Sequence, residues 1–115
     1  MRSDLELRRA RAAANEVLFR QVNDRIDELN VGLGGSDAVP HYVCECLNVG
    51  CAELIAIPHE EYQQIRRNPI EFFVVPGHEQ PDVEEAVHWD DRCVVVRKLG
   101  AGAEIAAEAA ESRQQ

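Results

Sequence analysis

The chain has 115 residues, which fits one domain, and 45% of them are hydrophobic although only 5% are aromatic. Its formal charge is −9, and a surface this acidic repels phosphate backbones, which argues against nucleic acid as a partner. No apolar run reaches the roughly 18 residues of a membrane span, and the charged N-terminus lacks the apolar segment of a secretory signal, so we expect a cytoplasmic protein with reduced thiols.

The first element is a long amphipathic helix, predicted over residues 4–30. Ser3 or Asp4 can cap its start. At about 1.5 Å per residue it is about 40 Å long, more than a small domain needs for cover. Two interpretations follow: the helix lies on the domain's own sheet, or part of it pairs with a second copy. The apolar positions at helical spacing are Leu7, Ala10, Ala14, Val17, Leu18, Val22, Ile26 and Leu29.

The sequence predicts three regions: residues 1–36 hold this helix and a glycine-rich hinge, residues 37–99 form the main domain, and residues 100–115 form a flexible Ala/Glu-rich tail. The fold class is α+β, with about four strands and two short helices after the long one. The predicted strands are 41–45 and 53–57, antiparallel across a cysteine-rich turn, then 70–75 as a central strand and 93–98; the predicted short helices are 60–67 and 81–88.

Three of the four cysteines, Cys44, Cys46 and Cys51, lie within eight residues in a C-x-C-x4-C pattern. The turn that joins them contains Asn48 and Gly50, residue types that tolerate the backbone conformations of tight turns. Thiolates this close together suit a tetrahedral soft-metal site, and Zn²⁺ is its usual occupant. The sequence therefore predicts a zinc knuckle between the first two strands.

A fourth ligand is needed to complete such a site. We favour His78, because it lies on a turn directly after the strand at 70–75 and can reach the knuckle. Cys93 is the alternative, although the start of a buried strand suits it better as a small core residue. We assign His41 to a strand entrance, His59 to a helix start and His88 to the surface.

Several short stretches between residues 15 and 98 form a distinctive pattern: Asn15-Glu16-x-Leu18-Phe19-Arg20-x-Val22-Asn23-x-Arg25-Ile26, Val43-Cys44-Glu45-Cys46, Cys51, Glu61-Tyr62-x-x-x-Arg66, Pro69, Pro76-Gly77-His78-Glu79, Val83-Glu84 and Val94-Val95. Over these stretches the chain resembles a family of small uncharacterised proteins, mainly from actinobacteria. The resemblance implies a zinc-binding domain whose signature residues are Cys44, Cys46, Cys51 and His78, and it implies no enzymatic activity.

Three functions remain open at this stage. A closed Cys₃His set and the lack of a catalytic motif favour a structural zinc in a non-enzymatic domain that acts through protein contacts, as a regulator or adaptor. Its partner is then another protein or a second copy, bound through the N-terminal helix. The alternatives are a thiol-based redox or metal sensor and a zinc-dependent hydrolase, which requires one coordination position to be open.

Overall fold

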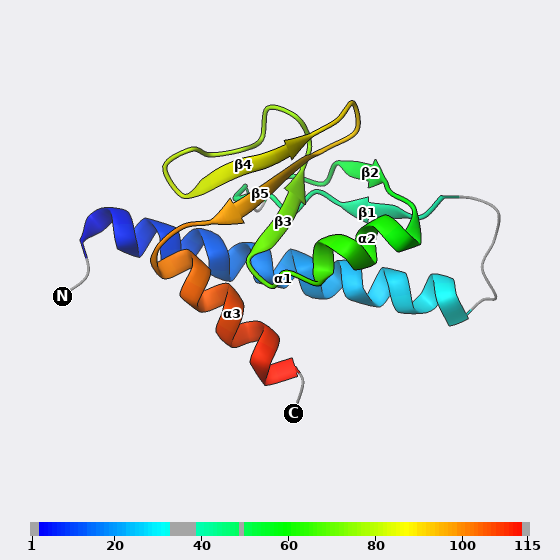
Figure 1. The fold of residues 1–115 in the computed structure, drawn as a ribbon, viewed down its shortest axis with the longest axis horizontal. Helices are drawn as coiled ribbons and strands as arrows, with labels where there is room; N and C mark the ends of the chain where they lie inside the picture. The colour runs from blue at the N-terminus through cyan, green and yellow to red at the C-terminus, as the bar shows by residue number, and fades with distance from the viewer. Residues whose placement is uncertain (1–2, 33–38, 49, 114–115) are drawn as a thin grey trace.

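The computed structural model describes residues 3–32, 39–48 and 50–113, and it has the predicted α+β architecture (Figure 1). A long helix runs along one side of two small sheets, and a second helix crosses it near the N-terminal end. The predicted hinge between the first helix and the main domain lies at 33–38, outside the described residues. The elements in chain order are α1 Asp4–Gly32, β1 His41–Val43, β2 Leu54–Ala56, α2 His59–Arg66, β3 Glu71–Val74, β4 Glu84–Trp89, β5 Val94–Lys98 and α3 Ala101–Arg113.

Helix α1 matches the predicted span, but it presents its polar side to the domain. Val17 and Ile26 pack against the core as their spacing suggested. The remaining apolar stripe faces outward: Leu7, Leu18, Val22 and Leu29 are exposed. The buried side carries small and polar residues instead, namely Ala12, Ala13, Glu16, Arg20, Asn23, Asp24 and Asp27. The local periodicity predicts the helix correctly, but ion pairs and hydrogen bonds to other elements determine which side of the helix faces inward.

Strands β1 and β2 pair antiparallel, as predicted, with Tyr42 opposite Ile55. The chain between them is the cysteine-rich turn. Two backbone hydrogen bonds hold its first residues: Cys44 N donates to Glu53 O at 2.9 Å, and Glu45 N donates to Phe73 O at 2.9 Å. The second bond ties the turn to β3, so the two sheets are joined at this point.

The second sheet has the strand order β3-β5-β4, all antiparallel. The prediction that the segment 70–75 is the central strand is therefore wrong, since β5 lies between β3 and β4. The predicted helix over 81–88 is also wrong, because β4 occupies Glu84–Trp89. The spacing of Val83 and Val87 fits a helix, but pairing with β5 overrides this local pattern.

Residues 101–113 form α3 and pack against α1, which contradicts the predicted flexible tail. Small side chains make this contact: Ala101 and Ala106 are buried on α3, facing the region of Ala12 and Ala13 on α1. A Cβ atom added at Gly102 would lie 2.9 Å from the carbonyl oxygen of Arg9, so the two backbones approach closely. A helix whose side chains have little apolar surface can thus still pack stably, because small side chains let two helices approach closely.

Helix α2 begins at His59 and ends at Arg66, within one residue of its prediction, and it contacts β1 through an aromatic pair and α1 through polar side chains. Tyr62 stacks on Tyr42 with ring centroids 4.3 Å apart. The Arg66 guanidinium donates to both carboxylate oxygens of Asp24, at 2.7 and 2.9 Å. None of the helices in the described part of the chain is long and apolar enough to cross a membrane.

Candidate metal centre

The four residues predicted as ligands come from three places in the fold. Cys44 directly follows β1, Cys46 lies two residues further on, and Cys51 precedes β2. His78 follows β3 on a turn in which its N–H donates to the carbonyl of Val75 at 2.9 Å. Gly77 has a φ of +95° in this turn, a conformation that favours glycine, and it directs the chain back so that His78 faces the cysteines.

The ligand atoms of these four residues all lie within 4.8 Å of one another. The imidazole Nδ1 of His78 is 3.6 Å from Cys44 Sγ and 3.7 Å from Cys51 Sγ. Cys44 and Cys46 are buried, whereas Cys51 and His78 are half-buried. The structure thus brings together the Cys₃His set that the sequence suggested, and the cluster could hold a metal ion.

The surroundings of the sulfurs suit metal thiolates. Burial raises the pKa of the Cys44 and Cys46 thiols above its ordinary value, so thiolates here need a compensating cation. The backbone N–H of Val75 donates to Cys44 Sγ at 3.2 Å, which favours the thiolate. Asn48 shapes the turn by accepting the N–H of Gly50 at its side chain and that of Cys51 at its carbonyl.

Glu53 orients the histidine ring. The Nε2 atom of His78 lies 2.9 Å from the Glu53 carboxylate, which fixes that nitrogen as the one that carries hydrogen and turns Nδ1 toward the sulfurs. Carboxylates commonly support metal-bound histidines in this way. From the sequence, Glu53 is predicted only as the start of a strand, and no local pattern points to this role.

Glu45 lies between Cys44 and Cys46 in the sequence, and its side chain connects the cysteine-rich turn to α1. Its side chain is fully buried and points away from the cluster, as strand alternation predicts. Arg20 binds both of its carboxylate oxygens, at 2.8 and 2.7 Å, and the Asn23 amide donates to one of them at 2.9 Å. Arg66, the nearby arginine of α2, donates to Asp24 instead.

The other candidate ligands lie elsewhere. Cys93 is buried at the start of β5, outside the cluster, and burial raises the pKa of its thiol to about 11. His59 Nδ1 lies 2.6 Å from Asp27, while His41 and His88 are exposed on strands.

A small open cavity of about 260 Å³ adjoins the cluster. Its lining residues are Cys46, Leu47, Asn48, Gly77, His78 and Gln80. A small molecule can therefore reach the half-buried His78 from solvent, and Cys46, which is 2% exposed, forms part of the cavity wall.

Comparison with family models, with curated proteins and with solved structures found no match to this chain.

Proposed function

We propose that this chain is a zinc-binding domain in which Cys44, Cys46, Cys51 and His78 hold one structural Zn²⁺. The observation that carries the proposal is the distance from His78 Nδ1 to two cysteine sulfurs, 3.6 and 3.7 Å. Tetrahedral zinc with Zn–S of about 2.3 Å and Zn–N of about 2.05 Å separates sulfur and nitrogen by about 3.6 Å. The resemblance to the actinobacterial family points to the same four residues.

The donor set favours a structural role over a catalytic one. Four protein ligands fill a tetrahedral zinc site and leave no position for water or substrate. Three thiolates favour zinc over harder cations such as Mg²⁺ or Ca²⁺. The domain then acts through protein contacts, as a regulator or adaptor, with α1 as the contact surface.

A thiol-based sensor is the second candidate, and the cavity beside Cys46 and His78 favours it. A small oxidant that entered the cavity would meet a zinc-bound sulfur. Loss of the metal would then loosen the turn that joins the two sheets. If stoichiometric peroxide leaves zinc bound and the fold intact, this candidate is excluded.

Metal analysis tests the main proposal on protein purified without added metal. We expect about one zinc per chain in the wild type and in His88→Ala and Cys93→Ala, which alter residues outside the cluster. We expect His78→Ala and Cys51→Ser to lose most of it. Equal zinc content in wild type and in both cluster variants, or iron in place of zinc, would contradict the proposal.

A further inference from the structure

The outward face of α1 is unusually apolar for this acidic protein. Among the described residues, eight large apolar side chains are exposed, and five of them lie on α1. Four of these, Leu7, Leu18, Val22 and Leu29, fall within an arc of about 60° when successive residues are placed about 100° apart around the helix. We call these four side chains the α1 stripe. Exposed apolar side chains gathered on one face in this way are typical of an interaction site.

The stripe repeats and is symmetric about its centre. Leu7, Leu18 and Leu29 are spaced eleven residues apart, a period that keeps a row of side chains nearly parallel to the helix axis. Read outward from Leu18 in either direction, the same face shows a small or branched apolar residue, then an arginine, then a leucine: Ala14, Arg11 and Leu7 on one side, and Val22, Arg25 and Leu29 on the other. A surface with this symmetry is complementary to itself when reversed.

We propose that two copies of this chain pair through antiparallel α1 helices, with a two-fold axis passing beside Leu18. The symmetry brings Leu18 of the two copies together, and it places Leu7 of one copy opposite Leu29 of the other. Ala14 then faces Val22, so a small side chain meets a larger one. In an isologous contact of this type each copy uses the same surface, so that surface is covered on both copies and the assembly stops at a dimer.

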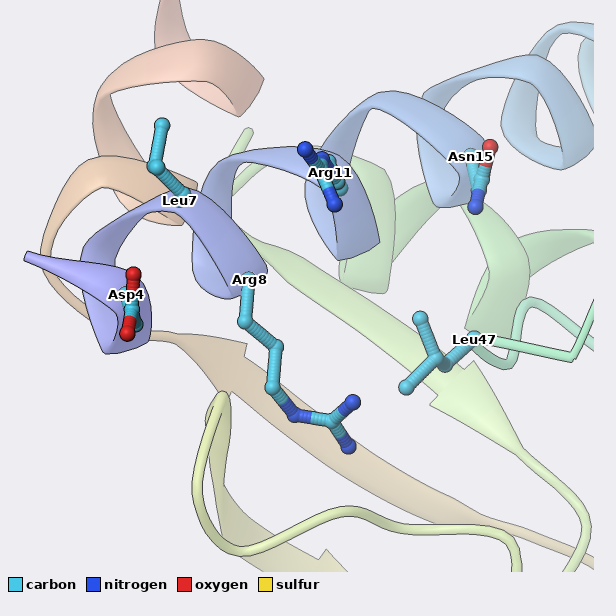
Figure 2. Close-up of a pocket in the computed structure, with 6 residues that line it drawn as sticks. All are labelled: Asp4, Leu7, Arg8, Arg11, Asn15 and Leu47. Atoms are coloured by element: carbon cyan, nitrogen blue, oxygen red, sulfur yellow. The ribbon is translucent and has the colours of Figure 1, made fainter.

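A groove beside the stripe supports this arrangement. It has a volume of about 510 Å³ and lies between the first half of α1 and Leu47 of the cysteine turn (Figure 2). Figure 2 shows Arg8 extending from α1 on the side of Leu47. The residues that line it are Asp4, Leu7, Arg8, Arg11, Asn15 and Leu47.

The partner helix places apolar side chains at this groove. A two-fold axis perpendicular to both helices keeps the same flank of each helix on the same side of the interface. By helical angle, Val22 and Leu29 are turned toward the groove flank of α1. In the antiparallel pair, Leu29 of the second copy therefore lies at the level of the groove of the first. Because the pair is symmetric, Leu29 of the first copy lies in the same way at the groove of the second.

The charges on this face permit two copies to approach. The formal charge of the whole chain is −9, but the positive and negative charges exposed on α1 nearly cancel. The exposed charged residues of this helix are Asp4, Arg8, Arg11, Arg25 and Glu28. Arg11 of one copy faces Arg25 of the other, and Glu28, which lies 3.5 Å from Arg25, offsets this repulsion. Both arginines can lay their apolar stems along the stripe and keep their charges in water.

Sedimentation and light scattering on the full chain test the proposal. We expect the wild type to reach twice the 12.9 kDa of one chain as concentration rises. Leu18→Glu should raise the dimer dissociation constant about 100-fold or more, because the leucine is buried twice in each dimer. Leu54→Glu is the matched control: Leu54 on β2 has the same exposure as Leu18, 59%, and this variant should dimerise normally.

A charge exchange tests the antiparallel register. Leu7→Lys and Leu29→Glu should each weaken the dimer, and the double variant should regain it, because the two new charges of opposite sign face each other across the axis. A parallel pair would gain nothing from the combination. A wild type that stays monomeric, a Leu18→Glu variant that dimerises like the wild type, or a double variant without recovery would overturn the proposal.

The inference rests on α1 being a contact surface, which is one part of the proposed function, and it does not require the metal. Zinc content distinguishes a failure of the proposed metal site from a failure of the proposed dimer. Leu18→Glu should be a folded monomer with wild-type zinc, so a failed metal site and a failed dimer give different results.

Discussion

The buried ion pair between Arg20 and Glu45 is the strongest link between α1 and the cysteine-rich turn, and Arg20→Met should destabilise the protein severely. Both side chains are at most 5% exposed. Glu45 accepts two bonds from Arg20, and the same guanidinium donates to the carbonyl of Glu71 at 2.6 Å and lies over the ring of Phe72. The substitution would leave Glu45 with the bonds from the Asn23 amide and the backbone N–H of Phe73.

The magnitude follows from the cost of a buried carboxylate without its cation. Breaking a buried pair from one side typically costs about 3–5 kcal/mol, out of about 5–15 kcal/mol for a whole domain. We therefore expect Arg20→Met to lower the free energy of unfolding by about 3 kcal/mol or more. With a urea dependence of about 1–3 kcal/mol/M, the midpoint should fall by about 1–3 M.

Urea unfolding with zinc held in excess measures this effect. Arg97→Met is the control, because Arg97 is a half-exposed arginine 3.1 Å from Glu71, and an exposed pair contributes about 0–1 kcal/mol. Adding Glu45→Gln to Arg20→Met should recover part of the loss, since the amide carries no charge to bury. If Arg20→Met costs no more than Arg97→Met, Glu45 does not depend on Arg20 and our reasoning is wrong.

Three further predictions concern a buried carboxyl, the contact between two helices and the metal. Burial raises the pKa of Glu16 to about 8, from 4.5. Because the raised pKa makes folding less favourable as pH rises between these values, Glu16→Gln should gain stability relative to wild type between about pH 4.5 and pH 8. If the stabilities of the two proteins change in parallel across this range, the reasoning is refuted. Gly102→Val should cost about 1–3 kcal/mol in thermal or urea unfolding, because its Cβ meets the Arg9 carbonyl, while Ala107→Val, at a half-buried position of α3, should cost less. A chelator should lower the melting temperature of the wild type but leave Cys51→Ser unchanged; an equal response in both proteins would argue against a structural metal.

Some of this fold follows from local patterns alone. Helix α1 could be predicted because its apolar residues recur over many turns, and β1 and β2 because they flank a compact cysteine turn. The candidate ligands could also be found in sequence, since C-x-C-x4-C is dense and His78 follows a strand on a glycine turn. These elements could be predicted because each pattern is formed by residues that are close together in the sequence.

Other features depend on partners that are distant in the chain. Glu84 belongs to a strand because β5 pairs with it and Lys98 donates to its carboxylate at 2.7 Å, whereas its own neighbours favoured a helix. The Ala-rich segment forms a packed helix because α1 offers small residues opposite it. Neither partner is visible from the segment itself.

The sequence by itself determined that the chain is an acidic α+β domain with a long helix and a Cys₃His set, because composition, periodicity and spacing are local properties. Only the tertiary structure decided which side of α1 faces inward. Periodicity locates an apolar stripe, but here the buried side is fixed by side chains such as Arg20 and Asn23, whose partners lie 20 or more residues away in the sequence. The leucines were thereby left at the surface, free to meet a second copy.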